Sequence, residues 1–409
     1  MLNILWLWFF LIGLLGGIYQ FFFLHHTEVF ADMVRSLFDM AELSVQVVLV
    51  LFGTLTLWMG FLRIAEKAGL IEALARLLSP ILGRLMPGVP HGHPAFGLIT
   101  LNFAANGLGL DNAATPIGLR AMKSLQSLNP NDKTATNAQI LFLVLNSSSL
   151  TLLPVTIFMY RAQQGAADPT LVFLPILLAT FCSSLVGLLS VAIVQRIPLW
   201  QPFLLFSLGG VILAFALFVA TLSTLSASAL NFVSSLLGNL SLILVIVGFL
   251  AYAAWRKVTV YDAFIEGAKG GFEIGRELLP YLVAMLCAIG FLRSSGALDL
   301  FLGVLQWLLE TVHLDTRFIE ALPTALAKPF SGSAARALMI ETMQHHGVDS
   351  FPALVAATVQ GSTETTFYVL AVYFGAVGIQ RTRHTVPCAL LADLSGIIAA
   401  IGICYWFFG

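Results

Sequence analysis

Hydrogen-bonding side chains lie at the centres of two apolar stretches, residues 352–379 and 141–160, each long enough to cross a bilayer. The first centre carries an amide, a carboxylate and hydroxyls: Gln360, Ser362, Thr363, Glu364, Thr365 and Thr366. The second carries an amide and hydroxyls: Asn146, Ser147, Ser148, Ser149 and Thr151. Such groups are costly at membrane depth and mark solute or ion pathways where they occur. The two stretches therefore predict a polar pathway with weakened helices.

Two carboxylates are candidates for coupling to an ion. A lone carboxylate near the bilayer midplane must be protonated, paired or bound to a cation. Glu364 fits this description, and Asp393 lies inside the last apolar stretch, 385–408. With hydroxyl and carbonyl oxygens they could form a proton or Na⁺ site. The alternative is structural, with Glu364 as a hydrogen-bond node and Asp393 bonded to backbone freed near residues 360–366.

Neutral polar residues are candidates for contact with a solute. They are Asn112, Thr115, Asn146, Ser148, Ser149, Thr151, Ser331, Ser333, Gln360, Ser362, Thr363 and Thr365. Hydroxyls in membrane helices more often bond their own helix or pack on a neighbour, which is the structural alternative for each. Arg336 could bind an anion, pair with Glu341 or reach the interface. His91, His93, His345 and His346 lack a nearby cysteine or carboxylate that completes a ligand set, so no metal site is predicted.

Composition identifies the class of protein that must position these residues. Of 409 residues, 58% are hydrophobic and 10% charged, and the mean hydropathy is +0.92, values typical of a polytopic membrane protein. A spanning helix needs roughly 20 apolar residues. The predicted crossings are 3–24, 44–62, 141–160, 171–194, 203–224, 229–255, 278–292, 352–379 and 385–408. The net charge of -1 gives no basis for a nucleic-acid partner, so the expected surroundings are the lipid bilayer.

Residues 3–24 lack a basic segment before them and an Ala-x-Ala site after them, so we expect an uncleaved spanning helix rather than a signal peptide. The four cysteines lie in apolar stretches without metal-type spacing and are predicted to be free thiols: Cys182, Cys287, Cys388 and Cys404.

Short matches in the same order indicate an internal duplication. The sequence Gly60-Phe61-Leu62-Arg63 recurs as Gly290-Phe291-Leu292-Arg293. The same register sets Asp32 opposite Asp262, Asn112-Ala113-Ala114 opposite Ser333-Ala334-Ala335, Asn146-Ser147-Ser148 opposite Gln360-Gly361-Ser362, Thr151 opposite Thr365, and Ala179-Thr180 opposite Ala392-Asp393.

The predicted fold is an all-α polytopic membrane protein with two inverted repeats, 1–196 and 229–409, joined by a linker, 197–228, with one spanning helix. Each repeat is expected to hold spanning helices, amphipathic helices, a re-entrant hairpin and a discontinuous helix. The hairpins are predicted at 94–122 and 318–345, where Gly, Asn, Pro and Ser interrupt apolar sequence. Interrupted backbone persists at membrane depth only where protein or a water-filled cavity satisfies it.

Basic residues predict the orientation, because cytoplasmic loops are rich in Lys and Arg. Most of the 20 lie in five places, 63–84, 120–133, 196, 256–276 and 381–383. With these segments in the cytoplasm, helix 3–24 runs outward and its partner 229–255 runs inward, so the two repeats are inverted. Inverted repeats with broken helices are the architecture of secondary transporters.

Particular motifs carry a resemblance to a known family. Residues 360–370, reading QGSTETTFYVL, and 372–379, reading VYFGAVGI, closely resemble the signature of spore maturation protein B, which 280–286 and 294–299 also fit. Residues 112–118, reading NAATPIG, with Leu145-Asn146, resemble spore maturation protein A. The chain thus resembles the two proteins joined end to end.

This resemblance implies membership of the nucleoside-recognition, or Gate, superfamily. It links the chain to concentrative nucleoside transporters and to the membrane part of ferrous iron transport protein B. In the nucleoside transporters, hairpin tips and unwound helices hold the nucleoside and a coupling cation. Here only the polar sequence around Gln360 and Glu364 matches, so the resemblance implies the architecture and leaves the ligand open.

Two functions remain as alternatives. The first is a secondary transporter or facilitator of a small polar solute, nucleoside-like or other, with a proton or Na⁺ as coupling ion and no further cofactor. The second is a non-transporting membrane scaffold in envelope or spore-type maturation. The chain has no Walker A sequence, Gly-x-Ser-x-Gly or His-Glu-x-x-His, so an enzyme is not expected. We expect a bacterial inner-membrane protein, and the sequence leaves open whether it forms a homo-oligomer.

Overall fold

A computed structural model describes residues 2–90, 92–107, 111–148, 150–311 and 315–409. Within these ranges the regular structure is helical, apart from one isolated bridge between Thr134 and Arg381. The chain forms two compact units. Each unit draws segments from both predicted repeats.

Unit 1 consists of residues 1–63, 157–169 and 261–360. Its helices are α1 (Leu2–Phe23), most of α2 (Val29–Lys67), most of α7 (Val155–Gln163), α11 (Val260–Ser294), α12 (Ala297–Thr311), η1 (Ile319–Ala321), α13 (Leu322–Ala327), α14 (Gly332–His346) and α15 (Phe351–Ser362) up to Gln360.

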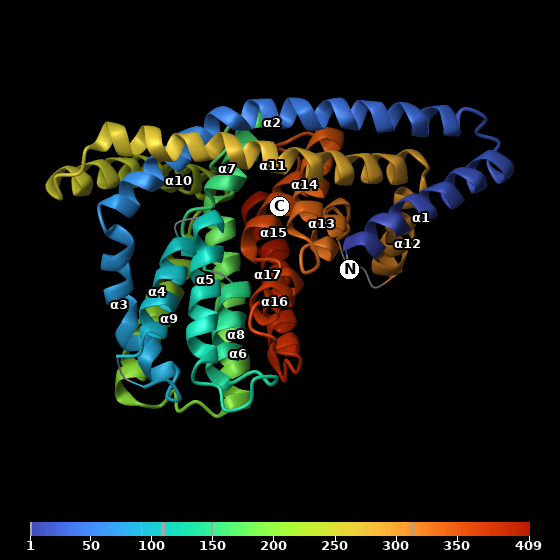
Figure 1. Ribbon diagram of the computed structural model, residues 1–409. Coiled ribbons are helices and arrows are strands. Elements are labelled where there is room, and N and C mark those ends of the chain that lie inside the picture. Colours follow the sequence, from blue (N-terminus) through green and yellow to red (C-terminus); the bar gives the residue numbers. More distant parts are fainter. Residues whose placement is uncertain (1, 91, 108–110, 149, 312–314) are drawn as a thin grey trace. The chain divides into compact units, whose positions relative to one another are not determined.

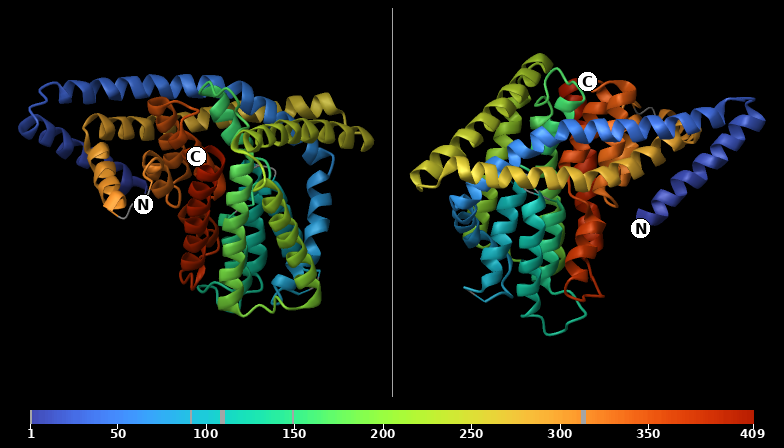
Figure 2. Two further views of the ribbon diagram at one scale, coloured as in Figure 1. Left: turned by 180° about the vertical axis from the view of Figure 1, so that it is seen from behind. Right: turned by 45° about the horizontal axis from the view of Figure 1, so that its top comes forward.

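Unit 2 consists of residues 64–156, 170–260 and 361–409. Its helices are α3 (Leu70–Leu85), α4 (Pro94–Gly107), α5 (Asp111–Gln126), α6 (Asn137–Ser148), α8 (Phe173–Gln195), α9 (Pro202–Leu222), α10 (Ala227–Trp255), α16 (Thr366–Gly375) and α17 (Thr385–Phe408). Helices α4, α5, α6, α8, α16 and α17 form a bundle whose axes run in similar directions (Figures 1 and 2).

Six of the described helices are long and apolar enough to cross a membrane: α1, α2, α8, α9, α10 and α17. The predicted crossing 278–292 lies in α11, which forms with α12 a pair bent by 69° that passes the same test. The other two predicted crossings, 141–160 and 352–379, are each broken into two helices, α6 with α7 and α15 with α16. The chain is a multi-pass, all-helical membrane protein, and nine crossings stay a prediction.

Each predicted amphipathic segment is continuous with the spanning helix that follows it. Helix α2 has 39 residues and α11 has 35, whereas the sequence favoured a separate short helix at Asp32 and at Asp262. No glycine or proline lies at the change from amphipathic to apolar sequence in α2, so the backbone continues unbroken. A change of polarity alone does not end a helix.

Helices α2 and α11 pack antiparallel within unit 1 (Figure 1). A Cβ added at Gly271 would lie 2.6 Å from the backbone of Thr56, whereas one added at Gly290 would lie 2.5 Å from Met40 Cγ. Positions thus rise along α11 as they fall along α2. Because these helices occupy equivalent places in the two predicted repeats, the packing agrees with an inverted arrangement, which stays a prediction.

Both predicted hairpins are present as pairs of packed helices. The first consists of α4 and α5, and the second of η1 with α13 followed by α14. At 1.5 Å per residue, the 16 residues of α5 extend about 24 Å, less than the roughly 30 Å of a bilayer core. The hairpins are therefore too short to cross the bilayer as separate helices, as a re-entrant position requires.

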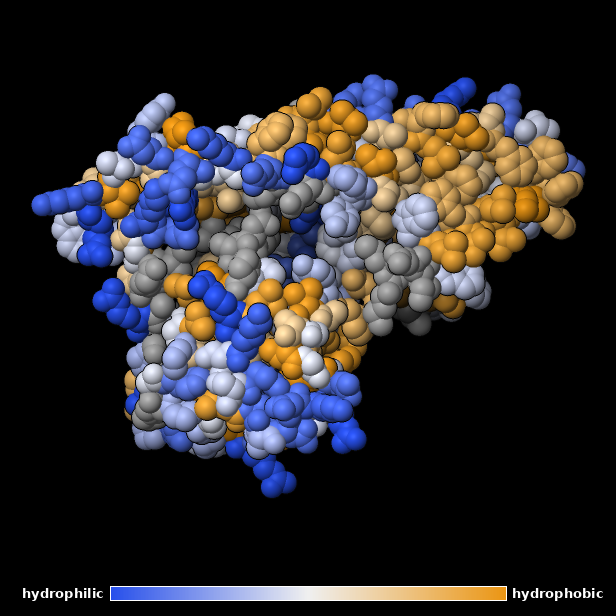
Figure 3. Space-filling view, in the orientation of Figure 1, coloured by the Kyte–Doolittle hydropathy of each residue, from blue (hydrophilic) through white to orange (hydrophobic). Residues whose placement is uncertain are grey.

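Large apolar side chains are exposed on the spanning helices. Hydrophobic residues gather over α1 and α2 in unit 1, and hydrophilic residues gather over the loops at the lower end of unit 2 (Figure 3). Leu15, Phe22 and Phe38 are 63%, 64% and 73% exposed. Such a surface is stable against lipid and unfavourable in water.

Contacts between loops join segments that the basic residues assign to the same side of the membrane. In unit 2, Gln380 N and Arg381 N donate to Lys133 O at 3.0 and 2.9 Å. In unit 1, the Arg161 guanidinium donates to Val348 O at 3.0 Å and to Asp349 at 2.8 Å. These contacts agree with the predicted orientation.

Candidate functional site

The two broken helices meet inside unit 2. Helix α6 ends at Ser148 and α7 begins at Val155, whereas α15 ends at Ser362 and α16 begins at Thr366. The amide of Glu364 in the second break donates to the carbonyl of Ser147 at 2.8 Å. Each break frees backbone N–H and C=O groups that a continuous helix would bond internally. The hydrogen bond between the two breaks satisfies one such group in each of them.

The first break is also held by the first hairpin and by α8. Leu152 N donates to the carbonyl of Gly107, the last residue of α4, at 3.1 Å. Thr151 N donates to the hydroxyl of Thr180 on α8 at 3.3 Å. Both residues before the break in α6, Ser147 and Ser148, are buried. The unwound segment is therefore fixed at several points.

A network of amides and one phenol surrounds the end of α6. Asn106 donates to Asn146 at 2.5 Å, and Asn102 donates to the carbonyl of Ala114 at 2.7 Å. The phenol of Tyr373 on α16 lies close to both Asn146 and Asn102. Its ring lies where a side chain at Gly118 would be, so glycine on α5 makes room for it. The network joins α4, α5, α6 and α16.

The second break presents hydroxyls in a buried position. Thr363 and Thr365 are 3% and 5% exposed, and Glu364 is half-buried. Among the described residues, the hydroxyls of Thr363 and Thr366 are buried without a hydrogen-bond partner. Buried polar atoms without a protein partner are rare and are usually satisfied by water or a ligand. The break therefore has hydrogen-bonding capacity left for a guest molecule.

Asp393 is 1% exposed and belongs to the face of α17 that packs on α8 and on the second break. Ser183 on α8 donates to Ala392 O at 2.9 Å. Gly396, one turn after Asp393, lies against Thr363, and an added Cβ there would be 2.7 Å from Thr363 Cγ2. The pairs Ser183 with Gly187 and Ala392 with Gly396 have the four-residue spacing of small residues that lets membrane helices approach closely.

Three predicted site residues form a separate cluster in unit 1. Ser331 caps α14 by accepting from Ala334 N at 3.1 Å, and its hydroxyl is 3.1 Å from that of Ser333. Gln360 donates to Gly332 O at 3.5 Å, and its buried Oε1 has no hydrogen-bond partner among the described residues. The buried ammonium of Lys328 donates to the carbonyl of Gln360 at 2.8 Å.

The structure thus gathers Asn146, Ser148, Thr151, Ser362, Thr363, Glu364, Thr365 and Asp393 in unit 2. Thr115 is half-buried on α5 in the same unit. Ser149 and the side chain of Asn112 lie outside the described residues. Sequence reasoning missed Tyr373 as part of the site. A tyrosine in an apolar helix shortly after a break is a usable signal, since a buried phenol usually finds a partner.

Pairing with Glu341 is one of the three alternatives that the sequence leaves for Arg336. Glu341 pairs with Arg293, which also contacts Glu320 at 3.4 Å, whereas the Arg336 guanidinium lies 5.5 Å from the ring centre of Tyr160. The partner of Glu341 is thus a residue far away in sequence.

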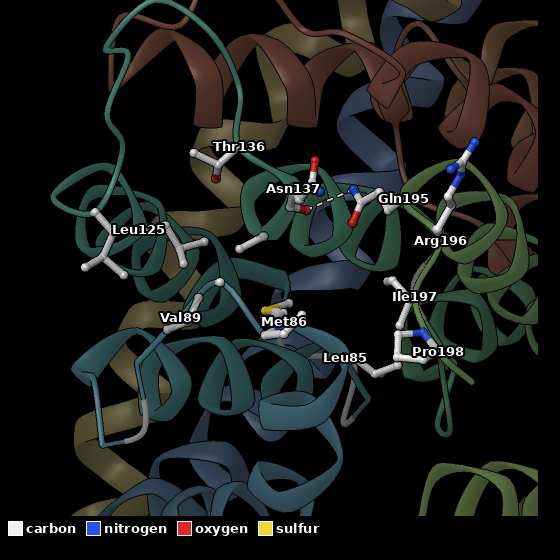
Figure 4. Close-up of a pocket in the computed structure, with 14 residues that line it drawn as sticks. Leu85, Met86, Val89, Leu125, Thr136, Asn137, Gln195, Arg196, Ile197 and Pro198 are labelled. Atoms are coloured by element: carbon white, nitrogen blue, oxygen red, sulfur yellow. Dashed lines mark hydrogen bonds between the residues drawn. The ribbon is translucent and has the colours of Figure 1, made fainter. Parts of the chain in front are cut away.

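A cavity of about 180 Å³ lies in unit 2 at the opposite end of α6 from the break. Leu85, Met86, Leu125, Asn137 and Gln195 are among its lining residues (Figure 4). Gln195 donates to Asn137 O and lies 3.0 Å from the imidazole of His384. Burial and the neighbouring Arg383 guanidinium lower the pKa of His384, so this imidazole is neutral at pH 7.

Comparison with known proteins gives matches to both halves. The Gate family, described as nucleoside recognition, matches residues 48–163 and again 276–380. Spore maturation protein B of Bacillus subtilis (strain 168) is 43% identical over 166 residues, 41% of this chain and 92% of that protein. Spore maturation protein A of the same organism is 35% identical over 185 residues, 45% of this chain and 91% of that protein. No solved structure matches.

The double match of one family agrees with a duplicated chain, and the two relatives together account for most of its length. The Gate family is transporter-like rather than enzymatic, which agrees with the broken helices and buried polar residues described above. This chain belongs to the Gate family, as a single protein homologous to spore maturation proteins A and B in fused form.

Proposed function

We propose that this protein is a secondary transporter or facilitator of a small polar solute in the bacterial cytoplasmic membrane, driven by a proton or Na⁺ gradient. The observation that carries the proposal is the contact of the two helix breaks, where Glu364 N donates to Ser147 O. Unwound backbone beside a carboxylate gives both partial charges and a titratable group at one place.

The ion is assigned to Glu364 and Asp393. A carboxylate buried as deeply as Asp393 stays ionised only with strong compensation, which a cation or hydrogen-bond donors supply, and otherwise it carries a proton. Hydroxyls of Thr363 and Thr365 and freed carbonyls would complete an oxygen shell, which suits Na⁺. The solute is assigned to the neutral groups around the first break, chiefly Asn146, Ser148 and Thr151.

The description of the family as nucleoside recognition suggests a nucleoside-like solute. Amide and hydroxyl side chains can donate and accept, as recognition of sugar hydroxyls and base edges requires. The scaffold alternative draws on the spore maturation relatives, whose names state a process rather than a transported molecule.

A ligand screen tests the proposal. The purified protein is heated in detergent with nucleosides, amino acids or dicarboxylates, and unfolding is followed. A ligand at 100 times its Kd stabilises the folded state by about 2.7 kcal/mol, which raises the apparent Tm. A hit is carried into proteoliposomes for uptake under imposed proton and Na⁺ gradients. If none of the three classes gives a thermal shift or uptake, the scaffold is favoured.

Labelling tests the inverted orientation separately. In a variant without the four native cysteines, single cysteines replace Lys123, Lys257 or Asp168. The first two should react only with a reagent applied from the cytoplasm, and the third only from outside. Reaction of positions 123 and 257 from opposite sides would remove the inverted repeats while leaving the ligand screen unaffected.

A further inference from the structure

We infer that the two halves of this chain, 1–196 and 229–409, are obligate partners that assemble as a one-to-one pair, and that an unbroken chain between them is not needed to hold the assembly together. The inference rests on how the two units are built. Unit 1 needs 1–63 and 157–169 from the first half and 261–360 from the second. Neither half by itself contains all segments of either unit.

Contacts between the halves in unit 1 run along entire helices. Trp6 Nε1 donates to Ala284 O at 2.9 Å, joining α1 to α11. The Arg63 guanidinium on α2 pairs with Glu266 on α11. Gly271 brings α11 against the backbone of Thr56, where a larger side chain has no room. Close backbone approach through glycine is how membrane helices associate in lipid, where apolar burial supplies little driving force.

A buried arginine, Arg161, also connects the two halves within unit 1. Arg161 is 0% exposed and donates to the carbonyls of Asp168, Pro169 and Val348 and to the carboxylate of Asp349. The first two partners belong to the first half and the last two to the second. Without the second half this guanidinium would lose its carboxylate, which is strongly unfavourable for a buried charge.

Unit 2 shows the same dependence. Ser183 of the first half donates to Ala392 O of the second, and Gln195 lies 3.0 Å from His384. The loops around Lys133 and Arg381 form the only bridge among the described residues. The contact of the two breaks also joins the halves. A separated half would leave backbone of its broken helix unsatisfied in lipid.

The linker packs on unit 2 at a few places, since Leu204 is buried in the core of that unit and Phe215 stacks on Phe181. Helix α9 is largely exposed, with Phe206 79% and Leu213 61% accessible. The relatives of the two halves are separate proteins, each matched over more than nine-tenths of its length. Where the two halves are separate proteins, the same contacts would therefore form between two chains.

Cleavage of the intact protein tests the inference. A protease site flanked by flexible residues is inserted between Thr224 and Leu225, in the exposed turn between α9 and α10, and an affinity tag is placed at the N-terminus. After purification and cleavage, the sample is diluted into excess empty detergent micelles and recaptured. The untagged fragment should be retained in a ratio of one to one. Its release, with both fragments still helical by circular dichroism, would overturn the inference.

Two glycines on one helix give a matched control. In the cleaved protein, Gly271→Leu should release the untagged fragment, because the side chain meets Thr56 backbone at 2.6 Å. Gly270→Leu should retain it, because the nearest atom there is the flexible end of Met59 at 3.8 Å. Equal retention by both variants would refute the role of the α2–α11 contact. If Gly271→Leu cannot be purified, retention or release of the untagged fragment from the cleaved unsubstituted protein still tests the inference.

Discussion

The two helix breaks share a backbone design and differ in charge. In the register of the repeats, Thr151 corresponds to Thr365, but Glu364 has Leu150 as its counterpart and Asp393 has Thr180. Thr180 serves the first break as a neutral acceptor for Thr151 N. The same position in the second half carries a carboxylate that is 1% exposed. In the predicted register, both halves therefore have an unwound segment, and the carboxylates lie in one half only.

This difference assigns separate tasks to the two breaks. A neutral acceptor can hold backbone or bind a solute without responding to an ion gradient. A carboxylate in apolar surroundings costs several kcal/mol to ionise without compensation, so its occupancy by a proton or cation changes the stability of the break around it. On the proposed function, the second break senses the ion and the first contacts the solute.

The largest effect is expected from Glu364→Gln. Glutamine keeps the size and most of the hydrogen bonding and removes the charge, so the protein should still fold. Uptake driven by an ion gradient should fall more than about tenfold, because losing one ionic contact costs about 1.4 kcal/mol or more. Exchange of solute without an ion gradient should persist. The measurement is uptake into proteoliposomes.

Asp132→Asn, in the exposed loop before α6, is the control for a lost negative charge. Its uptake should match that of the unsubstituted protein. If Glu364→Gln takes up solute as well as this control does, the two breaks do not differ in the way proposed, and Glu364 is a structural residue.

A large side chain at Gly396 should disturb the second break almost as strongly. Gly396→Leu forces Thr363 away from α17, because even the Cβ would lie 2.7 Å from Thr363 Cγ2. Overpacking of this kind typically costs about 1–3 kcal/mol, so the Tm should fall together with gradient-driven uptake. Gly402→Leu on the same helix, where no atom lies within 4 Å, should be silent. Equal Tm values for both variants would contradict the described packing.

Asp393→Asn should give the same kind of loss as Glu364→Gln but a smaller one, about threefold to tenfold if the two acids share one ion. The reason is that Glu364 remains to bind it. The half-saturating Na⁺ concentration or the pH dependence of uptake should shift in this variant. An unchanged ion dependence would mean that Asp393 does not belong to the ion site. The functional difference between the two breaks would then rest on Glu364 alone.

Much of the site could be predicted because polar residues at membrane depth leave few structural choices. The centres at Asn146 and Glu364 cannot sit in continuous lipid-facing helix at low cost, so both breaks were predictable. The hairpins follow from glycine and proline in the same way. The contact between the two breaks was not predictable, because it depends on how distant segments pack.

Long-range partners were beyond the sequence for the same reason. Pairing with Glu341 was one alternative for Arg336, yet the partner of Glu341 is Arg293, 48 residues away in the chain. Lys328 has no local pattern that reveals a role, since its ammonium bonds a carbonyl on another helix. The mixing of both repeats in each compact unit is also a property of packing. Periodicity describes one helix at a time.

A smaller effect is expected at the neutral break. Asn146→Ala removes the hydrogen bond that Asn106 donates and a candidate contact with the solute. At about 0.5–1.5 kcal/mol for a neutral hydrogen bond, solute affinity should weaken roughly threefold to tenfold, with the ion dependence unchanged. Solute binding by calorimetry and uptake at several ion concentrations check both parts. A change in ion dependence would mean that the first break also contributes to the ion site.

The smallest effect is expected from Tyr373→Phe. The ring still fills the space beside Gly118, and only the hydroxyl near Asn146 and Asn102 is lost. Solute affinity should therefore weaken by about twofold to fivefold, less than for Asn146→Ala, because the amides keep their bonds to α4 and α5. Tyr368→Phe, on the same helix but 55% exposed, is the matched control and should bind as the unsubstituted protein does. A larger loss of affinity for Tyr373→Phe than for Asn146→Ala would contradict this order. The solute site would then lie nearer to α16 than to the first break, and the neutral part of the site would include α16.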